Sequence, residues 1–344
     1  ELQKVMSKAQ KIIDKGDFES YDHLEEMVRE ALQVGEVDTG TADVFFNLDE
    51  VLDDDFRHPI PLGIAGIDNL LKGGLAKGEI GVILAPTGVG KTTVLSKIAN
   101  NAFNLGYNVL QIFFEDNPKI IQRKHFTMWT KIAPDNLSLQ REEVLEKVKQ
   151  IKENAPNRLI LKKLPSDTLT MNQIKNQMRK MIAEGIKLDL VVVDYIDCIV
   201  PDKNLGDEWK SEGSVMRGFE SMCHELDIAG WTATQGNRSS ISSEVVTTDQ
   251  MGGSIKKAQV GHVIISIAKS LQQKEMNLAT IAITKSRIGK DGIVFENCKF
   301  DNEMIEIDTD SSVTFLGMEE QKEEKNKVRI QELLQKRKQR ESKI

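Results

Sequence analysis

The sequence predicts an α/β fold in which a mostly parallel sheet carries helices on both faces. Short runs rich in Val, Ile and Leu alternate with stretches of helical periodicity along most of the 344 residues, which is the pattern of buried parallel strands joined by helices. One run leads directly into the glycine-rich stretch APTGVGKTT. Several later runs end in a polar residue, and open α/β sheets bind their ligands at the carboxyl ends of their strands.

Four consecutive segments are expected along the chain. Residues 1–36 have apolar residues at helical spacing, which predicts a helical arm that docks on another surface, such as a neighbouring subunit. Residues 37–60 are acidic and irregular, as is typical of a linker. The α/β domain is expected over residues 61–310, and residues 311–344 form a charged tail for which a solvated helix and a contact to a partner or nucleic acid are the two interpretations.

The strands of the α/β domain are expected at apolar runs. They are residues 79–85, 108–115, 158–164, 189–194, 230–235, 262–268 and 279–285. Runs that are apolar throughout fit strands that are buried on both faces, which indicates parallel pairing. The last runs follow one another closely and are accompanied by turns such as Lys290-Asp291-Gly292, so they are expected to extend the sheet in antiparallel fashion.

Composition narrows the class of protein. The chain is 40% hydrophobic, 29% charged and 5% aromatic, and no apolar run approaches the roughly 18 residues of a membrane span. No charged leader precedes an apolar segment, so a cytoplasmic location without a membrane partner is expected. The formal charge of -7 argues against a protein that coats nucleic acid but permits a local basic groove. The chain begins at Glu1 instead of Met, from which a fragment or a processed form is expected, and whether an N-terminal domain is missing stays open.

The glycine-rich stretch is nearly the phosphate-binding pattern G-x-x-x-x-G-K-[ST], and it lies between a strand and a helix as that motif requires. Its residues are Ala85, Pro86, Thr87, Gly88, Val89, Gly90, Lys91, Thr92 and Thr93. Gly88 and Gly90 can adopt positive φ, Lys91 supplies charge for terminal phosphates, and Thr92 offers a hydroxyl to Mg²⁺. Ala85 replaces the first glycine at the strand's exit, where an extended conformation suffices. The motif therefore predicts that ATP binds with Mg²⁺.

Three polar residues at strand ends indicate hydrolysis. Asp194 closes LDLVVVD and could hold Mg²⁺, Glu115 closes VLQIFFE and could be the general base, and Gln235 closes GWTATQ and could sense the γ-phosphate. Each has a plainer interpretation, namely a strand-end cap for Asp194 and ordinary surface residues for the other two. Their shared position at one edge of the sheet is the stronger observation.

Several stretches, in this order along the chain, resemble the motor domain of DnaB-type hexameric replicative helicases within the RecA-like ATPases, phage-type helicases being the most similar. They are GIDNLLKGGLAKGEIGVILAPTGVGKTT, FFED, VVVDYID, TATQGNR and ITKSRIGKDG. The resemblance covers residues 60–308, and TQGNR and K-x-R-x-G are its discriminating elements. It implies a RecA-like P-loop NTPase core that hydrolyses ATP, translocates on single-stranded DNA as a homo-hexameric ring and unwinds duplex, in a bacterial host's cytoplasm if the protein is phage-encoded.

The resemblance also implies roles for individual residues. Lys91 and Thr92 hold phosphate and Mg²⁺, Glu115 is the catalytic base, and Asp194 and Gln235 are the second-motif aspartate and the γ-phosphate sensor. Arg287 resembles the arginine finger that reaches the nucleotide of the neighbouring subunit, and Lys285 lies beside it on the same side of the strand. The alternative for this last pair is that both charges merely solubilise a strand end.

The same resemblance places single-stranded DNA against the loop TTDQMGGSIKKAQ, residues 247–259. The candidate contacts are Gln250, Gly252, Gly253, Lys256 and Lys257. The glycines allow backbone N–H groups to approach phosphates, and the lysines add salt-dependent attraction, unless they form a solvated helix face. The sequence departs from the family at Gln250 or Met251, where arginine and glutamate are common.

Two other interpretations of the chain remain open. One is a RecA-class recombinase or KaiC-like ATPase, since GIDNLLKGGLAKGE also resembles their approach to the phosphate loop. The other is an interaction module in which ATP only sets the oligomeric state, although such a switch needs neither Glu115 nor Arg287. For the helicase interpretation, a primase and a helicase loader are the partners expected beside DNA.

Overall fold

The structure is a computed structural model that describes Gln10, Leu52 and residues 56–202, 208–237, 240, 245–251, 255–309 and 313–315, with residues 208–210, 249, 255–256 and 313–315 described by their backbone alone. The chain divides into two compact units, Glu1–Phe56 and Arg57–Ile344. Apart from Gln10, the predicted helical arm lies outside the described residues, as does most of the predicted tail. The second unit begins at Arg57, a few residues before the domain boundary predicted at residue 61.

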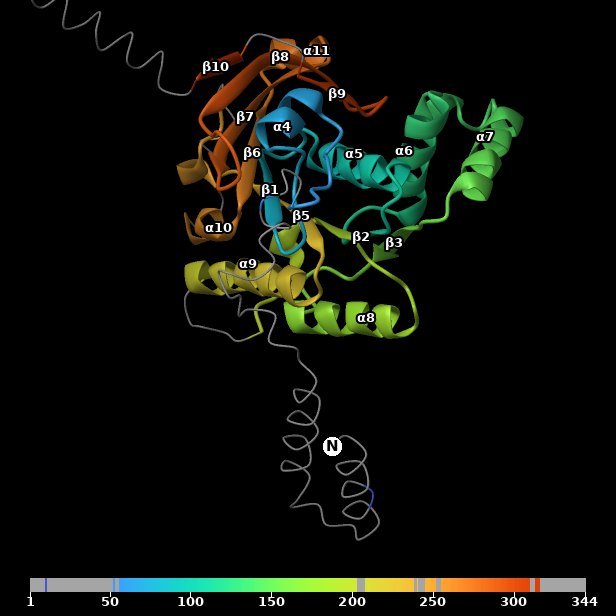
Figure 1. Ribbon diagram of the computed structural model, residues 1–344. Coiled ribbons are helices and arrows are strands. Elements are labelled where there is room, and N and C mark those ends of the chain that lie inside the picture. The colour runs from blue at the N-terminus through green and yellow to red at the C-terminus, as the bar shows by residue number, and fades with distance from the viewer. Residues whose placement is uncertain are drawn as a thin grey trace, which may run out of the picture. The chain divides into compact units, whose positions relative to one another are not determined.

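A ten-stranded sheet forms the centre of the second unit within the described residues (Figure 1). Its spatial order is β10-β8-β7-β6-β1-β5-β4-β2-β3, and β9 pairs with β8. The strands are β1 (Ile80–Ala85), β2 (Val109–Phe113), β3 (Leu159–Lys163), β4 (Leu190–Asp194), β5 (Ala229–Gln235), β6 (Val263–Ala268), β7 (Leu278–Ser286), β8 (Ile293–Asp301), β9 (Glu306–Asp308) and β10 (Val313–Phe315).

The pairing confirms the predicted mixed sheet. The strands from β3 to β6 in the spatial order pair in parallel, whereas β7, β8, β9 and β10 add antiparallel pairs. Each of the apolar runs predicted to be strands is a strand, with bounds that differ by at most two residues. The strands β8, β9 and β10 were not predicted, because β8 alternates buried with partly exposed residues beyond Phe295 and lacks a continuous apolar run.

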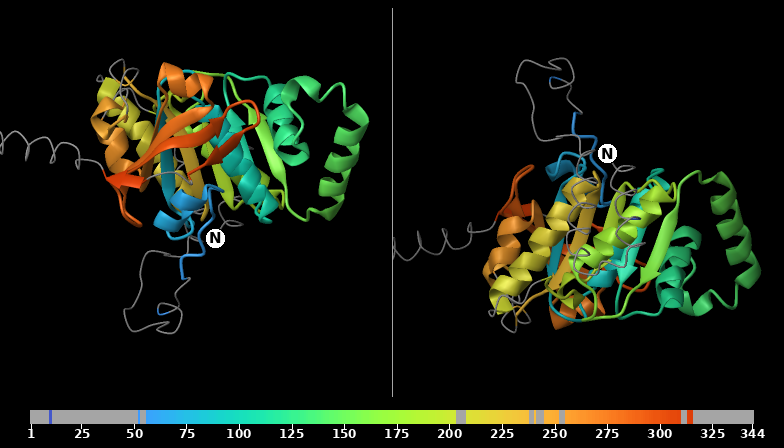
Figure 2. Two further views of the ribbon diagram at one scale, coloured as in Figure 1. Left: turned by 90° about the horizontal axis from the view of Figure 1, so that it is seen from above. Right: turned by 90° about the horizontal axis from the view of Figure 1, so that it is seen from below.

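Helices cover both faces of the sheet, as predicted. They are α4 (Ala65–Leu70), α5 (Lys91–Asn104), α6 (Pro118–Thr130), α7 (Arg141–Asn154), α8 (Met171–Ala183), α9 (Glu208–Glu225), α10 (Ile255–Val260) and α11 (Leu271–Glu275), with 3-10 turns η2 (Pro134–Asn136), η3 (Ile196–Cys198) and η5 (Thr248–Gln250). No helix in the described part of the chain is long and apolar enough to cross a membrane. Figures 1 and 2 show α8 and α9 on one face, and α6 and α7 beside the edge strand β3.

The strand β1 shows why its sequence is apolar throughout. Its side chains alternate between the two faces, with Ile83 and Ala85 in the hydrophobic core under α5 and Val82 and Leu84 in the core under α9. All four side chains are fully buried. Since full burial of an aliphatic side chain contributes about 1.5–3 kcal/mol, this central strand holds the following loop on a rigid base.

Candidate functional site

The glycine-rich loop connects β1 directly to α5, as predicted. Ala85 is the last residue of β1, it pairs with Gln235 of β5, and its carbonyl accepts the Gly236 N–H at 3.2 Å. Gly88 and Gly90 have φ of 77° and 124°, which a residue with a side chain rarely adopts. The structure therefore confirms that Ala85 fits an extended strand end and that the loop needs glycine at the two later positions.

Lys91 begins α5 with its ammonium group among carbonyls and carboxylates. Its Nζ lies 3.3 Å from the Ala85 carbonyl oxygen and 3.4 Å from that of Pro86. Burial lowers the pKa of Lys91, and the nearby charges of Asp194, Asp197 and Glu115 oppose this shift. Because its backbone partners are distant for hydrogen bonds, the cation retains capacity for a stronger acceptor.

Asp194 and Thr92 meet at the carboxyl edge of the sheet. Asp194 ends β4, in register with Phe113 at the end of β2, and is buried. Burial raises the pKa of Asp194 to about 6, whereas a hydrogen bond with the Thr92 side chain favours the charged form. A hydroxyl and a carboxylate side by side are the pair of ligands that P-loop NTPases offer to Mg²⁺.

Glu115 follows β2 and is oriented by Tyr195, a residue that was not predicted. The Tyr195 hydroxyl donates to Glu115 Oε1 at 3.1 Å, and its ring centroid lies 5.8 Å from Lys91 Nζ. Burial raises the pKa of the Tyr195 hydroxyl, so this hydroxyl remains a donor at neutral pH. Its place directly after Asp194 is the sequence signal that could have found it.

Gln235 reaches from the end of β5 to the loop. Its Nε2 donates to Thr87 Oγ1 at 2.5 Å, and its backbone N–H donates to Asp197 Oδ2 at 3.1 Å. Gln235 therefore contacts the phosphate loop through its side chain and a carboxylate of η3 through its backbone. A terminal phosphate in the loop would compete with Thr87 for this amide.

These elements enclose a cavity of about 400 Å³. Its described lining residues are Thr87, Gly88, Gly90, Lys91, Thr92, Thr93, Phe113, Glu115, Asp116, Asp194, Tyr195, Gln235 and Asn302. The cavity thus brings together the predicted phosphate, metal, base and sensor residues, while Pro86 and Val89 support the loop from outside the lining. Asp116 next to Glu115 was not predicted.

Asn302 enters the cavity from the turn between β8 and β9. The Thr93 hydroxyl lies 3.0 Å from Asn302 Oδ1, and Asn302 Nδ2 lies 3.5 Å from the Val89 carbonyl oxygen. Asn302 is separated from Thr93 by 209 positions, and no local pattern marks it. Sequence reasoning therefore had no signal for this contact.

The residues present fit a nucleoside triphosphate with Mg²⁺. A Cβ at Gly88 would meet no atom within 4 Å, so the loop leaves open space on the side where phosphates bind. The described residues contain no group of three or more His, Cys, Asp or Glu side chains suited to a metal. Mg²⁺ at phosphates needs only one or two protein carboxylates, and Asp194 with Thr92 meets that requirement.

Arg287 and Lys285 lie outside this cavity and contact α10. The Lys285 ammonium donates to the carbonyls of Ala258, Gln259 and Gly261 at 2.6, 2.8 and 2.7 Å. Burial and the charge of Arg287 lower the pKa of Lys285 to about 8. The exposed Arg287 donates to the Gln259 carbonyl at 2.6 Å, so neither cation serves the cavity of its own chain.

The structure corrects the expected DNA contact at Lys257. Its side chain is 3% exposed and pairs with Asp197 at 2.6 Å and Glu212 at 2.9 Å. A cation buried between carboxylates is unavailable to a phosphate backbone. The Gln250 side chain accepts the Thr247 N–H at 3.2 Å in the cap of η5.

The remaining DNA candidates are not tested. Gly252, Gly253 and the side chain of Lys256 lie outside the described residues.

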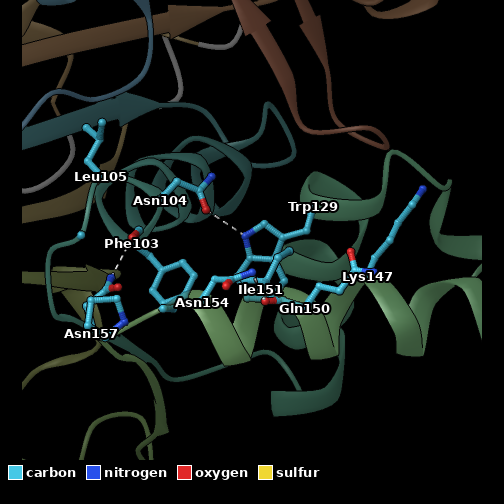
Figure 3. A pocket seen from close by; sticks show the side chains of 12 residues that line it. Phe103, Asn104, Leu105, Trp129, Lys147, Gln150, Ile151, Asn154 and Asn157 are labelled. Atoms are coloured by element: carbon cyan, nitrogen blue, oxygen red, sulfur yellow. Dashed lines mark hydrogen bonds between the residues drawn. The ribbon is translucent and has the colours of Figure 1, made fainter.

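A second cavity, of about 670 Å³, lies between α5, α6 and α7 (Figure 3). Trp129 Nε1 donates to Asn104 Oδ1 at 3.1 Å there, and the Phe103 ring packs against the Trp129 ring at 5.5 Å between centroids, tilted by 51°. Among the described lining residues, Lys147 is the only charged one, and it pairs with Glu143. Despite its larger volume, this cavity lacks the carboxylates and the phosphate loop that chemistry on a nucleotide requires.

The parallel sheet, the phosphate loop and the strand-end carboxylates define a P-loop nucleotide-binding protein of the RecA-like class. The family model of the DnaB-like helicase C terminal domain matches residues 59–343. The chain therefore belongs to the DnaB-like helicase C-terminal domain family.

Curated relatives and solved structures agree with this assignment. The chain is 21% identical over 243 residues to a DnaB-like replicative helicase of Enterobacteria phage T4, covering 67% of this chain and 50% of that protein. It is 26% identical over 189 residues to the replicative DNA helicase DnaB of Buchnera aphidicola, covering 52% and 40%. The chain thus spans about half the length of these relatives.

Two solved structures share the fold. One is a DnaB-like replicative helicase described with its interactions with primase, at TM-score 0.66 and 17% identity over 89% of this chain and 75% of that one. The other is the ATPase domain of G40P, at TM-score 0.63 and 16% identity over 84% and 98%.

Proposed function

We propose that this chain is the ATP-hydrolysing motor of a replicative DNA helicase. The observation that carries the proposal is the convergence of Lys91, Thr92, Glu115, Asp194 and Gln235 on one cavity at the carboxyl edge of the sheet. Such a set supplies a cation, metal ligands, a base and a sensor, which together suffice for phosphoryl transfer to water. Membership of the helicase family directs this chemistry toward DNA.

Each side chain has a distinct task in the proposed hydrolysis. Lys91 binds terminal phosphate oxygens, and Thr92 with Asp194 would hold Mg²⁺, which neutralises charge on those oxygens when bound. The Glu115 carboxylate accepts the proton of the attacking water, while the Tyr195 hydroxyl at 3.1 Å keeps Oε1 in place. The Gln235 amide exchanges its Thr87 partner for a γ-phosphate oxygen.

The cation for the transition state comes from a second subunit in this proposal. Arg287 is exposed and is directed away from its own cavity, whose described lining contains Lys91 as its only cation. An arginine finger supplied in trans accelerates phosphoryl transfer by roughly 10³–10⁵-fold. A homo-hexameric ring around single-stranded DNA, as expected from the family, supplies one such finger per cavity, and a primase is the proposed further partner.

The first test measures ATP hydrolysis by the full chain across protein concentration, with and without single-stranded DNA. Lys91→Ala, which removes the phosphate-binding cation, serves as the blank. We expect turnover per chain to rise with concentration, because Arg287 acts between subunits, and to rise again with DNA. Turnover that depends neither on protein concentration nor on DNA would contradict the proposal that the chain is a DNA motor. A strand-displacement assay then separates a helicase from a RecA-class or switch ATPase, which would hydrolyse ATP without unwinding.

A further inference from the structure

The Asp197 carboxylate contacts a residue of the nucleotide cavity, Gln235, and residues outside it. It accepts the Thr234 hydroxyl at 3.0 Å and the Gln235 backbone N–H at 3.1 Å. It also accepts the Lys257 ammonium at 2.6 Å. One carboxylate of η3 thus joins the sensor strand β5 to the helix α10, and no part of the proposed hydrolysis uses it.

Lys257, a residue of α10, is the cation that pairs with Asp197. Its side chain is almost completely buried, and Glu212 of α9 is its second carboxylate at 2.9 Å. A buried cation that loses its partners is strongly disfavoured, so Lys257 follows the carboxylates when they move. The position of α10 is therefore tied to that of Asp197.

The other end of α10 holds Arg287. The Gln259 carbonyl accepts both the Arg287 guanidinium at 2.6 Å and the Lys285 ammonium at 2.8 Å. Gln259 is two residues beyond Lys257 in the same short helix. Consecutive contacts therefore run from Thr87 in the cavity, through Gln235, Asp197 and α10, to the exposed guanidinium.

We infer that Asp197 and Lys257 are positioning residues that couple the nucleotide state of one cavity to the placement of Arg287 against the next subunit. This inference rests on the proposed function, since it requires Arg287 to act in trans. A phosphate oxygen is a stronger acceptor than the Thr87 hydroxyl, because hydrogen bonds to charged groups are about twice as strong as neutral ones. Gln235 turns toward it, its backbone N–H moves with respect to Asp197, and α10 carries the change to Arg287.

The test mixes two variants of the full chain so that only one kind of interface is active. The acceptor, Arg287→Ala, keeps an intact cavity but offers no finger. The donor, Glu115→Gln, binds ATP without hydrolysing it and keeps Arg287. Hydrolysis in the mixture therefore reports the donor's Arg287 acting in the acceptor's cavity.

Asp197→Asn is then added to the donor alone. Asn keeps one oxygen for Thr234 and Gln235, and Lys257 keeps Glu212, so no buried cation is left unpaired. We expect the rescued rate to fall about fivefold, while nucleotide binding by the donor stays within about twofold. Lys257→Met in the donor is expected to give a similar fall, and the two changes together no further fall, as for residues in one contact network.

Asp227→Asn in the donor is the matched control. Asp227 pairs with Lys77 at the same 2.6 Å, but on the exposed surface, and its loss should leave the rescued rate unchanged. Undiminished rescue by the Asp197→Asn donor would overturn the coupling while leaving the proposed function intact. Absence of rescue by the Glu115→Gln parent would refute the trans finger itself, and the coupling with it. If the Asp197→Asn donor shows no thermal unfolding transition, it is not folded, and the Asp197→Asn/Lys257→Met donor is used in its place. The two outcomes are then interpreted in the same way.

Discussion

Gly88 and Gly90 form a matched pair for testing how the phosphate loop is held. Both have positive φ, but their surroundings differ. A Cβ at Gly90 would lie 2.4 Å from Asn302 Oδ1 and 2.8 Å from Phe300 Cε1, whereas one at Gly88 would meet nothing within 4 Å. Alanine at position 90 must therefore displace a fully buried ring, and alanine at position 88 meets only open space.

The expected losses of unfolding free energy follow from these contacts. For Gly88→Ala, a left-handed alanine costs about 1–2 kcal/mol, and the reduced entropy of the unfolded chain offsets about 0.4–1 kcal/mol of it. For Gly90→Ala, the strained backbone costs about 1–3 kcal/mol and overpacking adds about 1–3 kcal/mol. The same entropic offset applies to Gly90→Ala, so we expect a net loss of about 1 kcal/mol for Gly88→Ala and of about 3 kcal/mol for Gly90→Ala.

Thermal unfolding without nucleotide measures the difference. At about 2–4 °C per kcal/mol for a domain of this size, Tm should fall by about 3 °C for Gly88→Ala and by about 9 °C for Gly90→Ala. Titration with a fluorescent ATP analogue should show the complementary effect, weakened binding by the folded Gly88→Ala variant, because its Cβ points into the phosphate space. Equal Tm values for the two variants would refute the packing of the β8–β9 turn on the loop.

Two further changes test the base and the core. Glu115→Gln should lower ATP turnover at least about 100-fold with nucleotide affinity changed less than about threefold, as measured by single-turnover hydrolysis and binding titration; unchanged turnover would exclude Glu115 as the base. His125 is buried between Gln111 and Asn100, and burial lowers its pKa from 6.5 to about 3. The unfolded chain therefore binds a proton below pH 6.5 that the folded chain excludes, and the free energy of unfolding should fall by about 2 kcal/mol from pH 7 to pH 5. Urea unfolding of the wild-type chain and of His125→Gln at the two pH values measures this effect. The decrease in unfolding free energy should be smaller by about 2 kcal/mol in His125→Gln. An equal decrease in both proteins would show that His125 is not its source.

The sequence predicted the parallel part of the sheet because buried strands require apolar residues on both faces. It predicted the cavity because the chain leaves each strand at a known edge, where Lys91, Glu115, Asp194 and Gln235 converge. The sequence also predicted that Ala85 can replace the first glycine of the motif, because the backbone conformation at a strand end depends on neighbouring residues alone. These predictions needed only periodicity and the direction of the strands.

Contacts between distant segments could not be predicted in this way. Lys257 has the same sequence signature whether its helix faces water or two carboxylates, and its partners Asp197 and Glu212 come from η3 and α9. Asn302 follows β8, which β7 and β6 separate from β1 in the sheet, so its contact with the loop depends on the tertiary fold. The roles of Lys257 and Asn302 therefore depend on contacts between segments that are distant in the sequence.

The buried Lys257 also bears on how the proposed motor would attract DNA. A lysine contributes to salt-dependent binding by neutralising a phosphate and releasing its counterions, and a cation already bound by two carboxylates does neither. Its charge instead holds α10 in a fixed relation to the nucleotide sensor, where Coulomb attraction is less screened than at the surface. Around α10 the described basic side chains of Lys257, Lys285 and Arg287 all donate to partners within the chain. In the proposed motor, the charge of Lys257 therefore holds α10 in position, and affinity for DNA must come from groups other than Lys257 and Lys285.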